Sequence, residues 1–286
     1  MRDALERADV EVERVARPEP DASDDPYRLQ ALLAALTPAP DGLLLLAPRR
    51  RPPGRLTPAP VLNRIPVGIV QADSPRQLAP WLAALRADAG LPPTPTWGAL
   101  AMGKDVFLEL GRSCIRSMRT GGAPHAMSVG NWLADTISRD SLCANLAAGP
   151  RLAVYIGHGR PLGWSGYQAV RWRHVEKIAC QRPCGIVVAF ACDTLNGLRG
   201  MTPFGCRWVY QGRACSYLGV TSGLDVAAGC RLMEEFGALL ATGNHQTIGQ
   251  LLVALDEQIG RREDLAPVRP AFSMFRLIGN PLQTLF

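Results

Sequence analysis

Short apolar runs of strand length alternate with helical segments along most of this 286-residue chain, and this alternation limits the possible folds more than any other feature. Buried strands are predicted at residues 42–48, 66–72, 97–102, 152–156, 185–191, 215–221 and 275–279. Helices are predicted at residues 28–36, 74–90, 144–148, 167–178, 226–242 and 246–260. Strands alternating with helices at this spacing favour a mainly parallel sheet with helices on both faces. The sequence therefore predicts a three-layer α/β domain.

The N-terminal segment differs from the rest of the chain. Residues 1–25 are highly charged, contain Pro18 and Pro20, and are followed by Pro26. Such a composition favours a flexible charged arm over a packed element. We therefore expect the folded domain to span residues 26–286.

The apolar stretches are too short to predict a membrane-spanning helix. The longest unbroken apolar stretch covers only residues 186–192, whereas a spanning helix needs about 20 such residues. The N-terminus mixes acidic and basic residues and has no apolar core, so no secretory signal is predicted. We expect a cytoplasmic protein, in which the eight cysteines are free thiols.

The formal net charge is +6, and arginines gather at residues 49–51 and 55 in a proline-rich stretch. A short basic loop of this kind is more often solvated than bound to a polyanion. No aromatic side chains are interleaved with these arginines, so stacking platforms for bases are not indicated. We expect no nucleic-acid partner.

Two predicted strands end in residues that carry chemistry. The strand at 152–156 leads into Gly157, His158 and Gly159, and the strand at 185–191 leads into Cys192. Sites in parallel sheets form beyond the carboxyl ends of the strands, so the imidazole and the thiol are expected to meet. A neighbouring imidazole can generate the nucleophilic thiolate and later protonate the leaving amine.

The glycines that flank His158 fit the same chemistry. A backbone without a Cβ lets a substrate chain approach closely, and the Gly159 amide can point at a developing oxyanion together with the Cys192 amide. Taken singly, each signal also has a structural explanation, since a histidine between glycines is often a turn residue and a cysteine that ends an apolar strand is often a core residue. The pairing of the two favours catalysis.

A metal site is a weaker interpretation of the cysteines. Structural zinc sites typically have a second closely spaced cysteine pair, and none accompanies Cys180, Cys184 and Cys206. We predict neither a metal nor an organic cofactor.

Several stretches resemble the gingipain-type cysteine peptidases of the caspase clan and, more distantly, caspases and CHAT-domain proteases. The similarity rests mainly on LAVYIGHGRPLGW and IVVAFACDTLNG, and it extends through ACSYLGVTSG and MFRLIGNPLQTL over residues 60–286. It implies a caspase-like fold, with His158 as general acid/base, Cys192 as nucleophile and the Gly159 amide in the oxyanion hole. Asn280 stands where that family usually has Asp, and we take this position as structural.

The resemblance also implies a substrate pocket beside the nucleophile, within reach of Trp164, Thr221, Ser222 and Asp225. An acid at Asp193 or Asp225 would favour a basic substrate residue, although each carboxylate could instead cap the helix that follows it. Arg160 or Arg199 could instead bind an acidic residue. The acidic residue that gives arginine-specific members their preference cannot be placed, so that preference is not carried over.

Two functions from different classes follow. The leading hypothesis is a cysteine endopeptidase that cleaves a protein or peptide substrate through a Cys192–His158 dyad. The alternative is a catalytically silent scaffold of the same fold that binds a partner chain. A regulatory or activating protein partner is expected under either hypothesis, and such a partner would suit a role in bacterial defence.

Overall fold

The computed structural model describes residues 40–49, 53–57, 59–90, 95–101, 105–166, 169–197 and 201–286. The predicted charged arm at 1–25, the predicted helix at 28–36 and Arg199 lie outside the described residues. Among the described helices, none is both long and apolar enough to cross a membrane.

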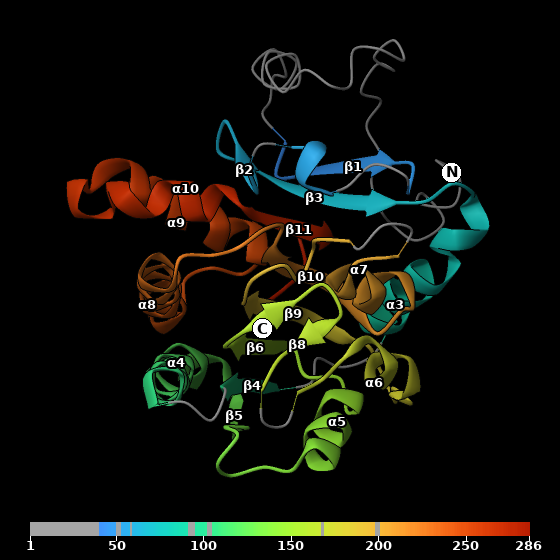
Figure 1. Cartoon of the computed structure of the whole chain (residues 1–286), viewed down its shortest axis with the longest axis horizontal. Helices are drawn as coiled ribbons and strands as arrows, with labels where there is room; N and C mark the ends of the chain where they lie inside the picture. The colour runs from blue at the N-terminus through green and yellow to red at the C-terminus, as the bar shows by residue number, and fades with distance from the viewer. Residues whose placement is uncertain are drawn as a thin grey trace.

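One large sheet runs through the described part of the chain (Figure 1). Its strands lie in the order β1-β3-β11-β10-β9-β6-β4-β5, and β2 pairs with β3 beside this path. The bounds are β1 Leu43–Ala47, β2 Val61–Leu62, β3 Ile65–Gln71, β4 Thr96–Ala101, β5 Ser128–Asn131, β6 Leu152–Ile156, β9 Cys184–Phe190, β10 Ala214–Val220 and β11 Phe275–Gly279. A separate hairpin joins β7 (Gly159–Arg160) and β8 (Gly163–Trp164).

The sheet consists of two parallel blocks that run in opposite directions. Strands β5, β4, β6, β9 and β10 are mutually parallel, and so are β1, β3 and β11. The blocks meet where β10 pairs antiparallel with β11. The predicted mainly parallel sheet is therefore confirmed, with one reversal between the blocks and a second at the short strand β2, which pairs antiparallel with β3.

Helices cover both faces of this sheet, as the three-layer prediction requires (Figure 1). Helices α4, α8, α9 and α10 lie on one side in this view, and α3, α5, α6 and α7 lie on the other. Their bounds are α3 Ala79–Gly90, α4 Asp105–Gly122, α5 Arg139–Ala147, α6 Trp172–Lys177, α7 Phe204–Tyr210, α8 Val226–Thr242, α9 Ile248–Arg261 and α10 Arg269–Ser273. The described residues also form short 3-10 helices at η2 Pro53–Arg55, η3 Pro75–Leu78, η4 Ala123–His125 and η5 Glu263–Val268.

Side-chain capping explains where two of these helices begin. The Asp225 carboxylate accepts from the Ala228 amide at the start of α8, and Thr247 forms a capping box with Gln250 at the start of α9. Each such cap contributes about 1 kcal/mol to the stability of its helix. Ser74, the first residue of the predicted helix at 74–90, has extended backbone and makes no side-chain cap bond to η3.

Helix α4 is the largest element that the sequence analysis missed. Its apolar residues Phe107, Leu110, Cys114 and Met118 recur at intervals of three or four, which is the period of an amphipathic helix. Helix α4 packs against α8 on the same face of the sheet. These two helices form two walls of the candidate site.

The two central strands are buried along their whole length. Every residue of β6 and of β9 is buried, including Val154, Val187 and Val188. Burying a valine side chain contributes about 1.5–3 kcal/mol relative to leaving it exposed, so these strands form a rigid base for the loops at their ends.

Candidate active site

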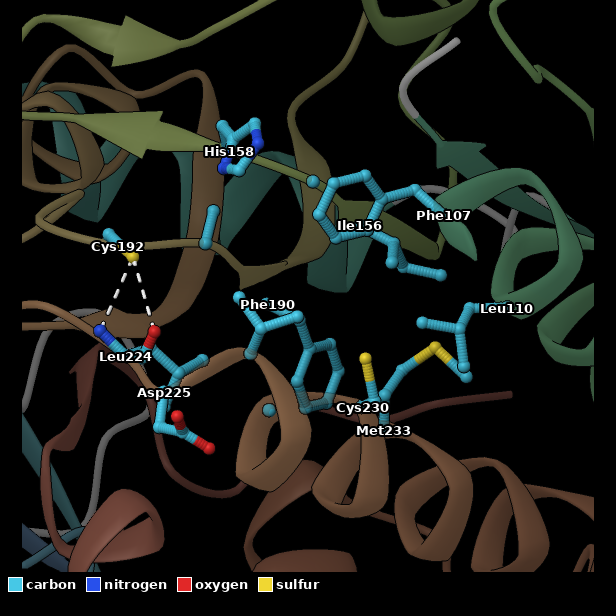
Figure 2. Close-up of a pocket in the computed structure, with 14 residues that line it drawn as sticks. Phe107, Leu110, Ile156, His158, Phe190, Cys192, Leu224, Asp225, Cys230 and Met233 are labelled. Atoms are coloured by element: carbon cyan, nitrogen blue, oxygen red, sulfur yellow. Dashed lines mark hydrogen bonds between the residues drawn. The ribbon is translucent and has the colours of Figure 1, made fainter. Parts of the chain in front are cut away.

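The register of β6 and β9 brings His158 and Cys192 to adjacent positions. The two strands are parallel, with Ile156 opposite Phe190, and the Gly157 amide donates to the Phe190 carbonyl at 3.3 Å. His158 and Cys192 each follow two residues after that pair. Figure 2 shows both side chains at the border of one pocket.

His158 is held through its backbone and its ring. The Tyr155 hydroxyl lies 2.8 Å from the His158 carbonyl oxygen, and the Ser165 amide donates to the same oxygen at 2.9 Å. The imidazole packs edge-to-face on Phe107 of α4, with ring centroids 5.1 Å apart and an interplanar angle of 80°. These contacts fix the strand end and one side of the ring.

Burial keeps the Tyr155 hydroxyl protonated, so that it can donate its hydrogen bond to this turn. Desolvation raises the pKa of its hydroxyl, so it stays protonated and can donate at physiological pH. Its ring stacks on Trp164 with centroids 4.4 Å apart.

The half-buried Cys192 thiol contacts the loop before α8. The Leu224 amide donates to Sγ at 3.3 Å, and Sγ lies 3.6 Å from the Leu224 carbonyl oxygen (Figure 2). Leu224 was missed by the sequence analysis, since nothing in its own side chain marks it.

Gly159 lies directly against the backbone at the end of β9. A Cβ built on Gly159 would stand 2.2 Å from the Cys192 carbonyl oxygen and 2.9 Å from the Ala191 Cβ. Only glycine fits this approach. The two backbone segments that carry the predicted oxyanion-hole amides are therefore in contact.

The pocket beside His158 and Cys192 has mainly apolar walls (Figure 2). The strand ends of β6 and β9 form its base, α4 forms one wall, and the start of α8 forms the other. Its lining residues are Phe107, Leu110, Ile156, Gly157, His158, Phe190, Ala191, Cys192, Leu224, Asp225, Val226, Gly229, Cys230 and Met233. The sequence analysis missed the α4 members and Cys230 and Met233, although the helical spacing in both segments would have predicted an inward face.

The acidic residues predicted to choose the substrate are engaged in local hydrogen bonds. Asp225 lies at the pocket and caps α8, with its Oδ1 accepting from the Ala228 amide at 2.9 Å. The Asp193 carboxylate accepts from Asn196 Nδ2 at 3.0 Å, and its backbone has φ of 58°. Helix capping by Asp193 was wrong, because a turn follows it and α7 begins only at Phe204.

Three further predicted residues lie outside the lining of this pocket. Trp164 is only 2% exposed and stacks between Tyr155 and Trp208, because the β7–β8 hairpin folds its ring inward. Thr221 donates its hydroxyl to the Met274 carbonyl at 3.1 Å, and the Ser222 carbonyl accepts from the Asp193 amide at 3.0 Å. The structure gives Trp164 a packing position in place of the predicted pocket position.

The seven cysteines other than Cys192 are buried or half-buried. Burial raises the pKa of each of the other seven thiols, to about 12 at Cys114 and Cys206. A thiol with a raised pKa stays protonated at neutral pH and is a poor nucleophile. All eight cysteines are free in the structure.

Comparisons with known proteins identify the fold. No protein-family model matches the sequence, and no curated protein matches it. Gingipain R (RgpB), an Arg-specific cysteine proteinase, superposes with a TM-score of 0.69 at 13% identity, over 94% of this chain and 69% of its own. The complex of the pro- and mature domains of Porphyromonas gingivalis RgpB gives a TM-score of 0.72 at 12% identity, over 99% of this chain and 75% of that chain.

A second group of solved structures shares the same architecture. The Saccharomyces cerevisiae separase–securin complex gives a TM-score of 0.53 at 16% identity, over 84% of this chain but only 16% of the matched chain. The chain therefore has the α/β fold of caspase-like structures, and the structural similarity expected from the sequence is confirmed. At these identities the likeness shows the fold alone.

Proposed function

We propose that this protein is a cysteine endopeptidase in which Cys192 is the nucleophile and His158 is the general acid/base. The observation that carries the proposal is the β6–β9 register, which places an imidazole and a half-buried thiol at one pocket. The shared fold with gingipain R and separase supports it.

In the proposed reaction, His158 takes the proton of the Cys192 thiol and the thiolate attacks the scissile carbonyl carbon. The backbone amides of Gly159 and Cys192 donate to the oxyanion that forms. As the C–N bond breaks, the imidazolium of His158 returns the proton to the leaving amine, and an acyl-enzyme thioester remains. His158 then removes a proton from water, the hydroxide attacks the thioester, and the released thiolate is reprotonated.

The test is a digestion of a proteome-derived peptide library by the wild type, Cys192→Ala, His158→Ala and Cys143→Ala. Cys143 is the matched control, because it is also a half-buried thiol but lies on α5, outside the pocket lining. We expect cleavage by the wild type and Cys143→Ala, and its loss in the other two variants. Equal cleavage by Cys192→Ala would contradict the proposal, and no cleavage by folded wild type would favour the silent scaffold.

We also propose that a protein partner regulates this site. The support comes from the solved complexes of RgpB with its prodomain and of separase with securin. Crosslinking in native cells, followed by identification of the chain bound near Cys192, tests this. The absence of any crosslinked partner while the free protein is fully active would contradict it.

A further inference from the structure

The walls of the pocket next to Cys192 contain almost no charge. Of the 14 residues that line it, Asp225 is the only one with a carboxylate, and none is a lysine or an arginine. Asp225 lies at the start of α8 and already caps that helix. The pocket therefore offers no free carboxylate to a basic substrate residue. It also offers no lysine or arginine to an acidic one.

The far side of the pocket is apolar and adaptable. Figure 2 shows Leu110 of α4 facing Met233 of α8, with the Cys230 thiol pointing into the space beside Phe190. Methionine is flexible and polarisable, so it adapts to apolar side chains of different shape. A cysteine with a raised pKa acts here as a small apolar surface.

One exposed apolar side chain extends the wall of the pocket towards solvent. Val226 at the start of α8 lines the pocket and is 53% exposed. It adds apolar surface that a bound side chain can cover.

The pocket is small and open to solvent on one side. The space between its walls is about 380 Å³, but this figure includes the part open to solvent, and the enclosed part is much smaller. Gly229 keeps the wall near Leu224 open, since a Cβ there would stand 2.8 Å from Leu224 Cδ2. Such a pocket suits a single side chain that enters from solvent and lies against the apolar walls.

We propose that this pocket binds an apolar side chain of the substrate residue beside the scissile bond, so that the enzyme cleaves next to Leu, Met or Phe and not next to charged residues. The proposal rests on the proposed endopeptidase function and names its substrate class. The position of His158 and Cys192 in the lining places the bound side chain next to the attacked carbonyl.

The first experiment is substrate profiling with the same peptide library, read by sequencing the new termini. We expect Leu, Met or Phe on one side of the cleaved bond, with kcat/KM about 10- to 100-fold above matched peptides that carry Lys, Arg, Asp or Glu there. Cleavage that prefers a charged residue, or that shows no preference on either side of the bond, would overturn the proposal.

The second experiment fills the pocket. Cys230→Phe should lower kcat/KM for a leucine peptide by about tenfold or more, and for the matched alanine peptide by less than about threefold. Cys143→Phe on α5 is the matched control and should change both by less than about twofold. If Cys230→Phe does not fold, Cys230→Met introduces a slimmer side chain and should also lower kcat/KM more for the leucine peptide than for the alanine peptide. An equal loss of kcat/KM for both peptides would contradict the proposal.

Binding to Cys192→Ala separates the two possible failures. We expect this variant to bind a fluorescent leucine peptide about tenfold more tightly than the lysine peptide. Selective binding without any cleavage by the wild type would overturn the proposed function and leave the pocket assignment standing. Cleavage beside charged residues would overturn the pocket assignment and leave the function standing.

Discussion

The two ends of the strands β6 and β9 carry very different polar groups. At the amino ends, Arg151 precedes β6 and donates to both oxygens of Asp88 at 2.9 and 2.7 Å. Arg182, just before β9, and Gln283 donate to the same carboxylate at 3.4 and 2.7 Å. The Arg151 and Asp88 side chains are only 6% and 11% exposed, so this group is a buried and mutually bonded cluster.

At the carboxyl ends, the side chains of His158 and Cys192 border a pocket. His158 packs on Phe107, Cys192 contacts the backbone of Leu224, and both side chains are half-buried. Their surroundings are apolar and open on one side, so a substrate can reach them.

Polar residues occur at both ends of the same two strands, and their partners distinguish the two groups. Where polar side chains satisfy one another in a buried cluster, loss of one leaves an uncompensated charge and lowers stability. Where they border an open pocket, their loss affects chemistry more than stability.

The largest effect is expected for His158. His158→Ala and His158→Phe should each lower kcat about 1,000-fold or more, because both remove the proton-transfer group. His158→Phe keeps an aromatic ring against Phe107, so its thermal unfolding midpoint should stay close to that of the wild type. Peptide hydrolysis and thermal unfolding check this, and an active His158→Phe variant would contradict the assigned role.

Arg151 should show the opposite behaviour. Arg151→Met removes two hydrogen bonds from a buried carboxylate and should lower the free energy of unfolding by about 3 kcal/mol, measured in urea. The activity per folded molecule should not change. Arg112→Met, which removes exposed ion pairs with Glu109 and Asp135, should lower the free energy of unfolding by less than about 1 kcal/mol. Equal losses of stability in the two variants would show that the cluster is not structural.

Gly159 lies where the turn that carries His158 contacts the end of β9. Gly159→Ala should lower kcat about 100-fold, because the new Cβ would displace the backbone from Cys192. Gly90→Ala is the control, since a Cβ at the end of α3 would meet nothing within 4 Å. If steady-state kinetics show the same small change for both variants, the close approach at Gly159 has no catalytic consequence.

The smallest effect concerns the second thiol of the pocket. Burial and the carboxylates of Glu234 and Asp225 raise the pKa of Cys230. Its thiolate therefore forms only at higher pH, and its alkylation by iodoacetamide at pH 8 should be a few-fold slower than that of a free cysteine peptide. Mass spectrometry of Cys192→Ala across pH 7–10 measures this, and Glu234→Gln should move the curve to lower pH.

The sequence predicted much of this fold because its central strands are continuous apolar runs. The segments around Val154 and Val188 can only be buried strands in an α/β chain, and the offset between His158 and Cys192 suits two adjacent parallel strands. The reversal at β10–β11 could not be predicted, since both directions bury the same side chains.

The pocket was predictable only in part. Its base follows from the two strand ends, whereas its walls depend on how α4 packs against α8. The contact between Leu224 and Cys192 runs through backbone atoms, which leave no sequence signal. Trp164 was misplaced because the sequence does not reveal that its hairpin folds inward onto Tyr155.

The most direct test of the catalytic assignment is covalent labelling by peptidyl acyloxymethyl ketones ending in Leu, Arg, Lys or Asp, with adducts located by mass spectrometry. We predict one adduct, on Cys192, formed by the wild type and Cys143→Ala, slowed strongly in His158→Ala and absent in Cys192→Ala. Labelling of Cys192 at the same rate without His158, or labelling of another thiol in its place, would contradict the dyad.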